Sequence, residues 1–242
     1  MLLLHSAIAD SRMWAPHLEA LGAEHDVLAP DLPGYGETPL EPGEIAYVEH
    51  AAGLLGRPAA VVGSSFGAKI AIELAIDRPD LVERLVVIGA PPLPGTEWSE
   101  AAQAGFAEEE EALERGDLDT AAEANVRMWI DGPRRAPGEV DPAVRELVRE
   151  MTLRSFELQI PLEDQVSARW IDPPANGRLG EIAAPTLVVV GDEDVADILE
   201  TADVLVREIP AARKAVIEGA GHLPGLERPD ELNRLLLDFL RG

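Results

Sequence analysis

The chain has 242 residues, no cysteine, and 20 basic against 45 acidic residues, which gives a formal net charge of -25. This charge opposes binding to nucleic acid or to an anionic membrane surface, and the lack of cysteine excludes disulfides and thiolate chemistry. Because no apolar run reaches membrane-spanning length and the start has no basic, signal-like region, we expect one globular protein located in the cytoplasm.

Short apolar runs recur along the chain, and most of them are separated by stretches with helical spacing. In chain order they are LLL at 2–4, VLA at 27–29, AAVVG at 59–63, LVVIG at 85–89, TLVVVG at 186–191 and KAVIE at 214–218. Strands that alternate with helices predict an α/β protein with a mostly parallel, doubly wound sheet.

The segment VVGSSFGAKIAIELA, residues 61–75, changes from a β-type run to helical spacing at two serines. Ser65 is the centre of a glycine-x-serine-x-glycine frame, and a sharp strand-to-helix turn there would lift its hydroxyl off the strand end. The flanking glycines let the backbone pack closely. We therefore predict that Ser65 is a nucleophile and that Ser64 faces the core or a neighbouring loop.

The alternation breaks between Pro91 and Pro185, where we expect consecutive helices and no strand. Both ends of this region are rich in proline and glycine, which punctuate structure. This pattern predicts a helical cap at 94–175, inserted into a core formed by 1–93 and 176–242. The run EEEE at 108–111 is interpreted as one solvated helix face.

Several large apolar side chains of the insertion either line a substrate pocket or form the small core of the insertion itself. Trp129, Phe156 and Trp170 are the pocket candidates, and Phe106 and Met128 belong to the same group.

A base for the serine is expected at His222, because IEGAGHLPGLERPDEL places it in a loop between a strand end and a helix. His17, His25 and His50 lie in helical or connecting stretches without a motif. A carboxylate that orients the histidine is expected just after TLVVVG. The residues available there are Asp192, Glu193, Asp194 and Asp197.

The order of Ser65, an acid after VVVG and His222 in GAGH resembles the α/β-hydrolase superfamily. The segments LLLHSAIADSRMW, DLPGYGETP and ERPDELNRLLLDFL resemble it too, so the likeness covers nearly the whole chain. The resemblance implies that Asp194 is the acid, with Asp192 and Asp197 as second choices. It also implies that the backbone amides of Phe66 and Ala7 form the oxyanion hole and that the insertion is the helical cap.

Two features depart from the family pattern. Ser6 stands where the family commonly has glycine, and if that position needs a positive φ, serine costs about 1 kcal/mol. The chain also begins at the LLLH strand, without the two antiparallel strands that usually precede it, so one sheet edge is expected to be bare. Either the start is truncated or a homodimer covers this edge.

Together these features predict a serine hydrolase with a Ser65-Asp194-His222 triad. Its substrate is expected to be a small carboxylic ester, lactone or thioester, and we expect no cofactor and no metal. The alternative is a non-catalytic protein of the same fold that senses a ligand or contacts another protein. Failure of a fluorophosphonate to label Ser65 would favour the alternative.

Overall fold

The core of the chain, in the computed structural model, is a sheet of five parallel strands. In spatial order they are β1 (Leu2–Leu4), β3 (Ala59–Ser64), β4 (Val82–Ile88), β6 (Thr186–Gly191) and β7 (Ala212–Ile217). The structure describes residues 1–242, except for the side chain of Pro137. Every residue of β1 and β6 is buried, as a sheet covered on both faces requires.

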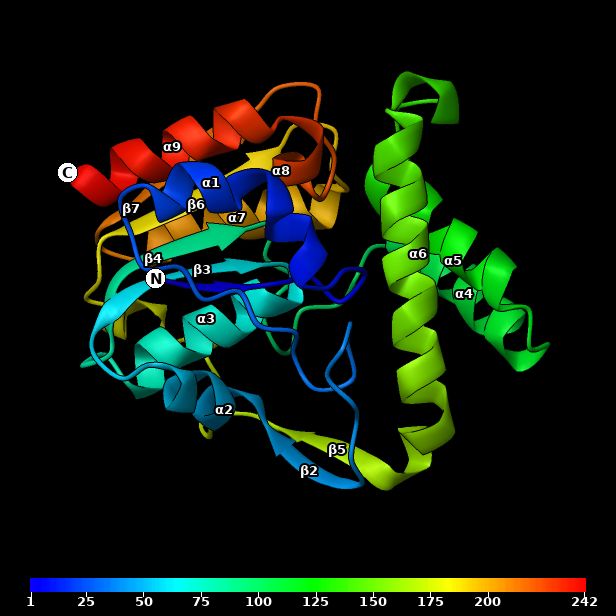
Figure 1. Cartoon of the computed structure of the whole chain (residues 1–242), viewed down its shortest axis with the longest axis horizontal. Helices are drawn as coiled ribbons and strands as arrows, with labels where there is room; N and C mark the ends of the chain where they lie inside the picture. The colour runs from blue at the N-terminus through cyan, green and yellow to red at the C-terminus, as the bar shows by residue number, and fades with distance from the viewer.

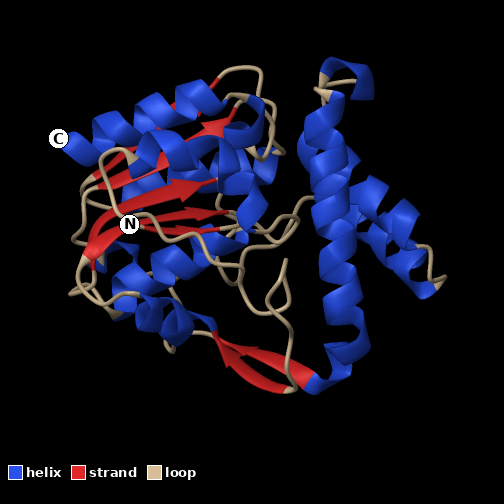
Figure 2. Cartoon of the chain, in the orientation of Figure 1, coloured by secondary structure: helices blue, strands red, loops and turns tan.

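Helices cover both faces of this sheet (Figure 1, Figure 2). Those that flank the sheet are α1 (Ala15–Gly22), α2 (Tyr47–Leu54), α3 (Phe66–Asp77), α7 (Ala196–Glu208), α8 (Pro224–Glu227) and α9 (Pro229–Arg241). Contacts join α1 to α9 on one face, whereas α2 and α3 contact each other on the opposite face, as right-handed crossovers require. The doubly wound, mostly parallel sheet predicted from the sequence is confirmed. None of the described helices has the length and apolar character needed to cross a membrane.

The edge of the sheet next to β1 differs from the expectation. Residues 27–29 form only a single parallel bridge, between Leu2 and Leu28, in place of the strand predicted there. The Leu3 N–H donates to the Leu28 carbonyl oxygen over 2.8 Å, so this segment covers the outer side of β1. The outermost position at this edge therefore belongs to Leu28, which is 42% exposed.

The insertion contributes three helices and a π-helical turn, which lie beyond the carboxyl ends of the parallel strands (Figure 1). They are α4 (Glu100–Glu114), α5 (Leu118–Asn125), the π-helical turn Val126–Asp131 and α6 (Pro142–Gln159). The expectation that this region holds no strand is wrong. A short strand, β5 (Val166–Arg169), pairs in parallel with β2 (Gly43–Ala46). Both strands have four residues and are largely exposed, so neither carries the apolar pattern that would reveal it.

Candidate active site

The turn between β3 and α3 holds Ser65 in a conformation that side chains rarely adopt. Its φ is 51° and its ψ is -109°, and no other non-glycine residue in the described chain has a positive φ. The Ser65 N–H donates to the Ile88 carbonyl oxygen over 2.8 Å, which fixes the turn against β4. A Cβ at Gly67 would lie 2.3 Å from the Leu4 carbonyl oxygen, and one at Gly63 would lie 2.2 Å from that of Gly67. Only glycine fits on both sides of this serine.

A buried histidine and a buried aspartate meet beside this turn. The Nδ1 atom of His222 lies 2.8 Å from Oδ2 of Asp194, and each side chain is 1% exposed. The other carboxylate oxygen of Asp194 accepts a hydrogen bond from the Val195 N–H over 2.8 Å. The carboxylate therefore fixes the ring so that its Nε2 atom is left for another partner.

The other acids that follow β6 have different partners. Asp192 accepts a hydrogen bond from the Gly219 N–H over 2.6 Å, and Glu193 pairs with an arginine of the insertion. Asp197 accepts two hydrogen bonds from Ser99, each 2.7 Å long. Across the described chain, no group of three or more histidine, aspartate and glutamate side chains is placed to hold a metal ion.

Two backbone amides near Ser65 are available as hydrogen-bond donors. Phe66 is the first residue of α3, and Ala7 lies in the loop after β1. Neither amide has an acceptor among the hydrogen bonds of the described residues. The Gly67 N–H donates to the His5 carbonyl oxygen over 3.1 Å, which ties the loop to the start of the helix. Two such donors on adjoining segments can stabilise an oxyanion.

The loop after β1 is held by the His5 ring. Its Nδ1 atom lies 2.9 Å from the Ser6 carbonyl oxygen, and its Nε2 atom accepts from the Leu32 N–H over 2.9 Å. These bonds fit the neutral ring, and burial lowers the pKa of His5. Ser6 has no positive φ, so the strain expected there is absent. Its hydroxyl is buried and has no hydrogen-bond partner among the described residues.

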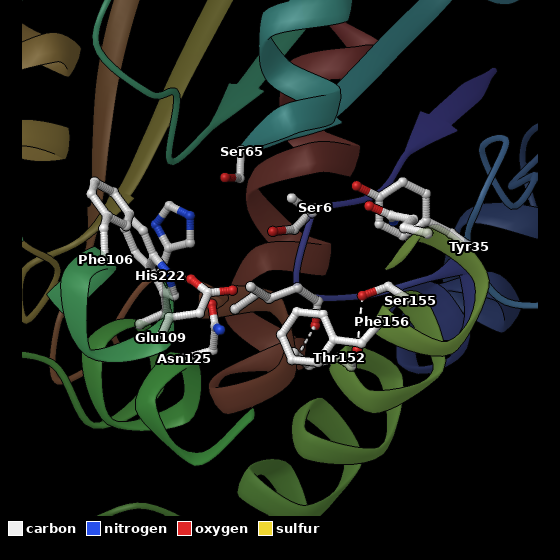
Figure 3. Close-up of a pocket in the computed structure, with 14 residues that line it drawn as sticks. Ser6, Tyr35, Ser65, Phe106, Glu109, Asn125, Thr152, Ser155, Phe156 and His222 are labelled. Atoms are coloured by element: carbon white, nitrogen blue, oxygen red, sulfur yellow. Dashed lines mark hydrogen bonds between the residues drawn. The ribbon is translucent and has the colours of Figure 1, made fainter. Parts of the chain in front are cut away.

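A cavity of about 260 Å³ opens between the core and the insertion, and both Ser65 and His222 line it. Figure 3 shows the Ser65 hydroxyl turned toward the His222 ring, although no hydrogen bond joins them among the described contacts. Two of the aromatic residues expected at a pocket, Trp129 and Phe156, line this cavity, and Phe106 does as well. The cavity thus joins side chains of the core with side chains of the insertion.

Trp170, the third aromatic candidate, does not line this cavity. Its ring stacks on Tyr47 with centroids 5.5 Å apart, and it meets Phe66 edge-on at 5.8 Å. The Lys69 ammonium lies 3.1 Å from the centroid of the Trp170 ring, where it makes a cation–π contact. Trp170 is therefore a packing residue that holds the end of β5 against α2 and α3.

Polar side chains of the insertion also line the cavity, and no motif in the sequence predicts them. Glu109 belongs to the run that was expected to be fully solvated, yet it is partly buried and faces the cavity, while its three acidic neighbours are exposed. Asn125 lies next to it and is buried. Glu109 stands three residues after Phe106 and three before the buried Ala112, a spacing that places all three on one helix face. This spacing is the signal that could have identified it.

The insertion directly contacts the loop that carries His222. The His222 N–H donates to the Trp129 carbonyl oxygen over 3.0 Å, and the centroids of the two rings are 4.5 Å apart. Arg135 and Glu227 form an ion pair of 2.6 Å with side chains 10% and 3% exposed. The other carboxylate oxygen of Glu227 accepts from the Gly221 N–H over 2.7 Å. A buried ion pair therefore links the insertion to the residue before His222.

Comparisons with known proteins agree with this fold. A sequence model described as the alpha/beta hydrolase family matches residues 1–235. A pimeloyl-(acyl-carrier protein) methyl ester esterase from Nitrosospira multiformis is 27% identical over 259 aligned positions, which span 100% of this chain and 94% of that protein. A 2-hydroxymuconate semialdehyde hydrolase from Pseudomonas putida is 31% identical over 88% of this chain and 76% of its own. The solved structure of a thermophilic esterase from Thermogutta terrifontis matches with a TM-score of 0.78 and 26% identity, covering 99% of this chain and 88% of that one.

Proposed function

This chain belongs to the alpha/beta hydrolase family, and from that premise we propose that it is a serine hydrolase that cleaves small carboxylic esters, lactones or thioesters. The observation that carries the proposal is the buried His222–Asp194 pair, whose histidine lines the same cavity as Ser65. A serine hydroxyl is a weak nucleophile on its own, and a neighbouring histidine held by a carboxylate is what activates it.

In the first half of the proposed reaction, the Ser65 Oγ attacks the substrate carbonyl carbon while the Nε2 atom of His222 takes the hydroxyl proton. Asp194 stabilises the imidazolium that forms. The negative charge on the carbonyl oxygen is met by the N–H groups of Phe66 and Ala7. The histidine then returns the proton to the leaving alcohol or thiol, and the acyl group stays on Ser65.

In the second half, water replaces the leaving group. His222 takes a proton from the water, the resulting hydroxide attacks the acyl carbon, and the proton returns to Ser65 as the acid leaves. No step requires a cofactor. Two of the named relatives are an ester hydrolase and a semialdehyde hydrolase, which supports hydrolysis as the type of reaction.

The size of the cavity supports small substrates. At about 260 Å³ it lies slightly below the usual range of ligand pockets. Aromatic side chains of the insertion close it on one side, so a long acyl chain would have to displace them. We therefore expect short acyl groups to be preferred.

A series of p-nitrophenyl esters of rising acyl length, together with an enol-lactone, tests this proposal. We expect hydrolysis that is fastest for the shortest acyl groups. The Ser65→Ala variant should lose about 10,000-fold in kcat/KM while it keeps its far-ultraviolet circular dichroism spectrum. Activity near that of the wild type in a folded Ser65→Ala variant would overturn the assignment.

A further inference from the structure

Three polar side chains of α6 that line the cavity already donate hydrogen bonds to the protein itself. The Thr152 hydroxyl donates to the Ile8 carbonyl oxygen over 3.2 Å, and the Ser155 hydroxyl donates to that of Thr152 over 2.8 Å. The side-chain amide of Gln159 donates to the Gly34 carbonyl oxygen over 3.0 Å. The two hydroxyl protons are therefore not free to bind a substrate, and none of the three groups carries a charge.

Glu109 differs from them. It forms no ion pair with any described residue, although it lines the cavity and is partly buried. Figure 3 shows its carboxylate pointing into the cavity next to the amide of Asn125. That amide is held in place by a hydrogen bond from its Nδ2 atom to the Ala121 carbonyl oxygen over 3.1 Å. Burial raises the pKa of Glu109 and the Asn125 amide acts against that rise, as expected for a carboxyl group that lacks a positive partner.

No basic residue in the described part of the insertion forms an ion pair with the Glu109 carboxylate. Arg127 pairs with Glu108, the solvent-exposed neighbour of Glu109 on α4. Arg145 pairs with Asp131 and Glu123. No lysine or arginine is found among the described residues that line the cavity. A bound carboxylate would therefore meet a like charge and no opposite one.

We propose that Glu109 makes this cavity selective for esters whose acyl or alcohol part carries a cationic amine, and selective against esters that carry a carboxylate. The proposal rests on the proposed serine hydrolase and names its substrate class. A protonated amine would supply the positive partner that Glu109 lacks, in a site where exclusion of water strengthens the attraction. An anionic substrate group would lie near the Glu109 carboxylate with no positive partner for either charge. Such an unpaired charge selects against the wrong substrate.

The test uses esters of matched shape that differ in one charged group. The alcohol-side set is 2-(dimethylamino)ethyl acetate, 3-methylbutyl acetate and 2-carboxyethyl acetate. The acyl-side set is methyl 3-(dimethylamino)propanoate, methyl 4-methylpentanoate and monomethyl succinate. In each set, the ratio of kcat/KM values for the cationic and the neutral ester is compared between variants, which cancels differences in intrinsic reactivity.

The two variants remove the same charge from the same helix. In Glu109→Gln the charge is lost from the cavity, and in Glu110→Gln it is lost from an exposed position. We expect Glu109→Gln to lower the cation-to-neutral ratio by about tenfold or more in at least one set and to raise the anion-to-neutral ratio. Glu110→Gln should leave both ratios unchanged. Equal effects of the two variants, or no effect of Glu109→Gln in either set, would overturn the proposal, because the overall acidic charge would then account for any preference.

A binding measurement separates this proposal from the proposed function. The amides N-(2-dimethylaminoethyl)acetamide and N-(3-methylbutyl)acetamide are titrated into Ser65→Ala, which lacks the proposed nucleophile. Tighter binding of the cationic amide, lost when Glu109→Gln is added, supports the selectivity even if no ester is hydrolysed. Equal binding of the two amides contradicts it even if Ser65 is shown to be the nucleophile.

Discussion

The two regions that meet at the cavity hold their residues in different ways. In the core, the turn at Ser65 is fixed by backbone atoms that approach so closely that a Cβ at Gly63 or Gly67 has no room. The insertion contributes side chains of its helices to the cavity, such as those of Glu109 and Phe156. In this account, the core determines which bond is broken, and the insertion determines which molecule is admitted.

The largest expected effect is on kcat/KM, and it concerns Asp192 and Asp194, the two aspartates of the core that follow β6. Asp194→Asn should lower kcat/KM by about 1,000-fold to 10,000-fold, because an amide no longer fixes the His222 ring in the required tautomer. Asp192→Asn should cost less than about tenfold, since an asparagine oxygen still accepts from the Gly219 N–H. Steady-state kinetics on one ester measure both. The reverse ranking would move the role of the acid to Asp192.

A pair of glycine substitutions compares the two regions directly. Gly67→Ala should lower the free energy of unfolding by about 4 kcal/mol or more, because its Cβ would lie 2.3 Å from a backbone oxygen that cannot move. A Cβ at Gly105 in α4 would meet the Met128 Sδ at 2.7 Å, and that flexible side chain can turn away. Gly105→Ala should therefore change the stability by no more than about 1 kcal/mol, helped by the higher helix propensity of alanine. Urea titration measures both, and equal losses of unfolding free energy would contradict this difference between the two regions.

The contact between the two regions gives the next prediction. Arg135→Gln leaves Glu227 buried without its partner, so we expect a loss of about 3 kcal/mol in unfolding free energy and about tenfold in kcat. Arg134→Gln removes the same charge from a pair whose arginine is 51% exposed, and it should cost less than about 1 kcal/mol. If the two variants lose the same stability and activity, the buried pair does not position the loop that carries His222.

The smallest effect is a difference in the pH dependence of stability. Burial lowers the pKa of His5 from its ordinary 6.5, so the unfolded chain binds the extra proton first and stability falls as the pH drops through 6.5. Burial raises the pKa of Glu109 from 4.5, so there the folded chain binds the extra proton and stability falls as the pH rises above 4.5.

Urea unfolding at several pH values in wild type, His5→Gln and Glu109→Gln separates these two contributions. His5→Gln should flatten the loss of stability toward acid pH, by at most about 1.4 kcal/mol for each pH unit. Glu109→Gln should change the slope in the opposite sense. Parallel curves for all three proteins would show that neither group titrates differently on folding.

The sequence predicted the core better than the insertion, for a physical reason. A sharp turn with close backbone packing requires glycine, so Gly63 and Gly67 reveal Ser65 directly. The wall of a pocket requires only side chains of suitable size, and many residues meet that requirement. Trp170 and Trp129 are therefore alike in the sequence, although the first packs on Tyr47 and the second on His222. Glu109 was hidden inside a run of four glutamates, where only its spacing from Phe106 distinguishes it.

The central claim is that Ser65 is a nucleophile activated by His222, and covalent labelling tests it most directly. The folded wild-type protein is treated with a fluorophosphonate, and the labelled peptide is identified by mass spectrometry. We expect a single adduct on Ser65 that is absent in Ser65→Ala and much slower to form in His222→Ala. A folded wild-type protein that does not react, or an adduct on another serine such as Ser6 or Ser64, would contradict it.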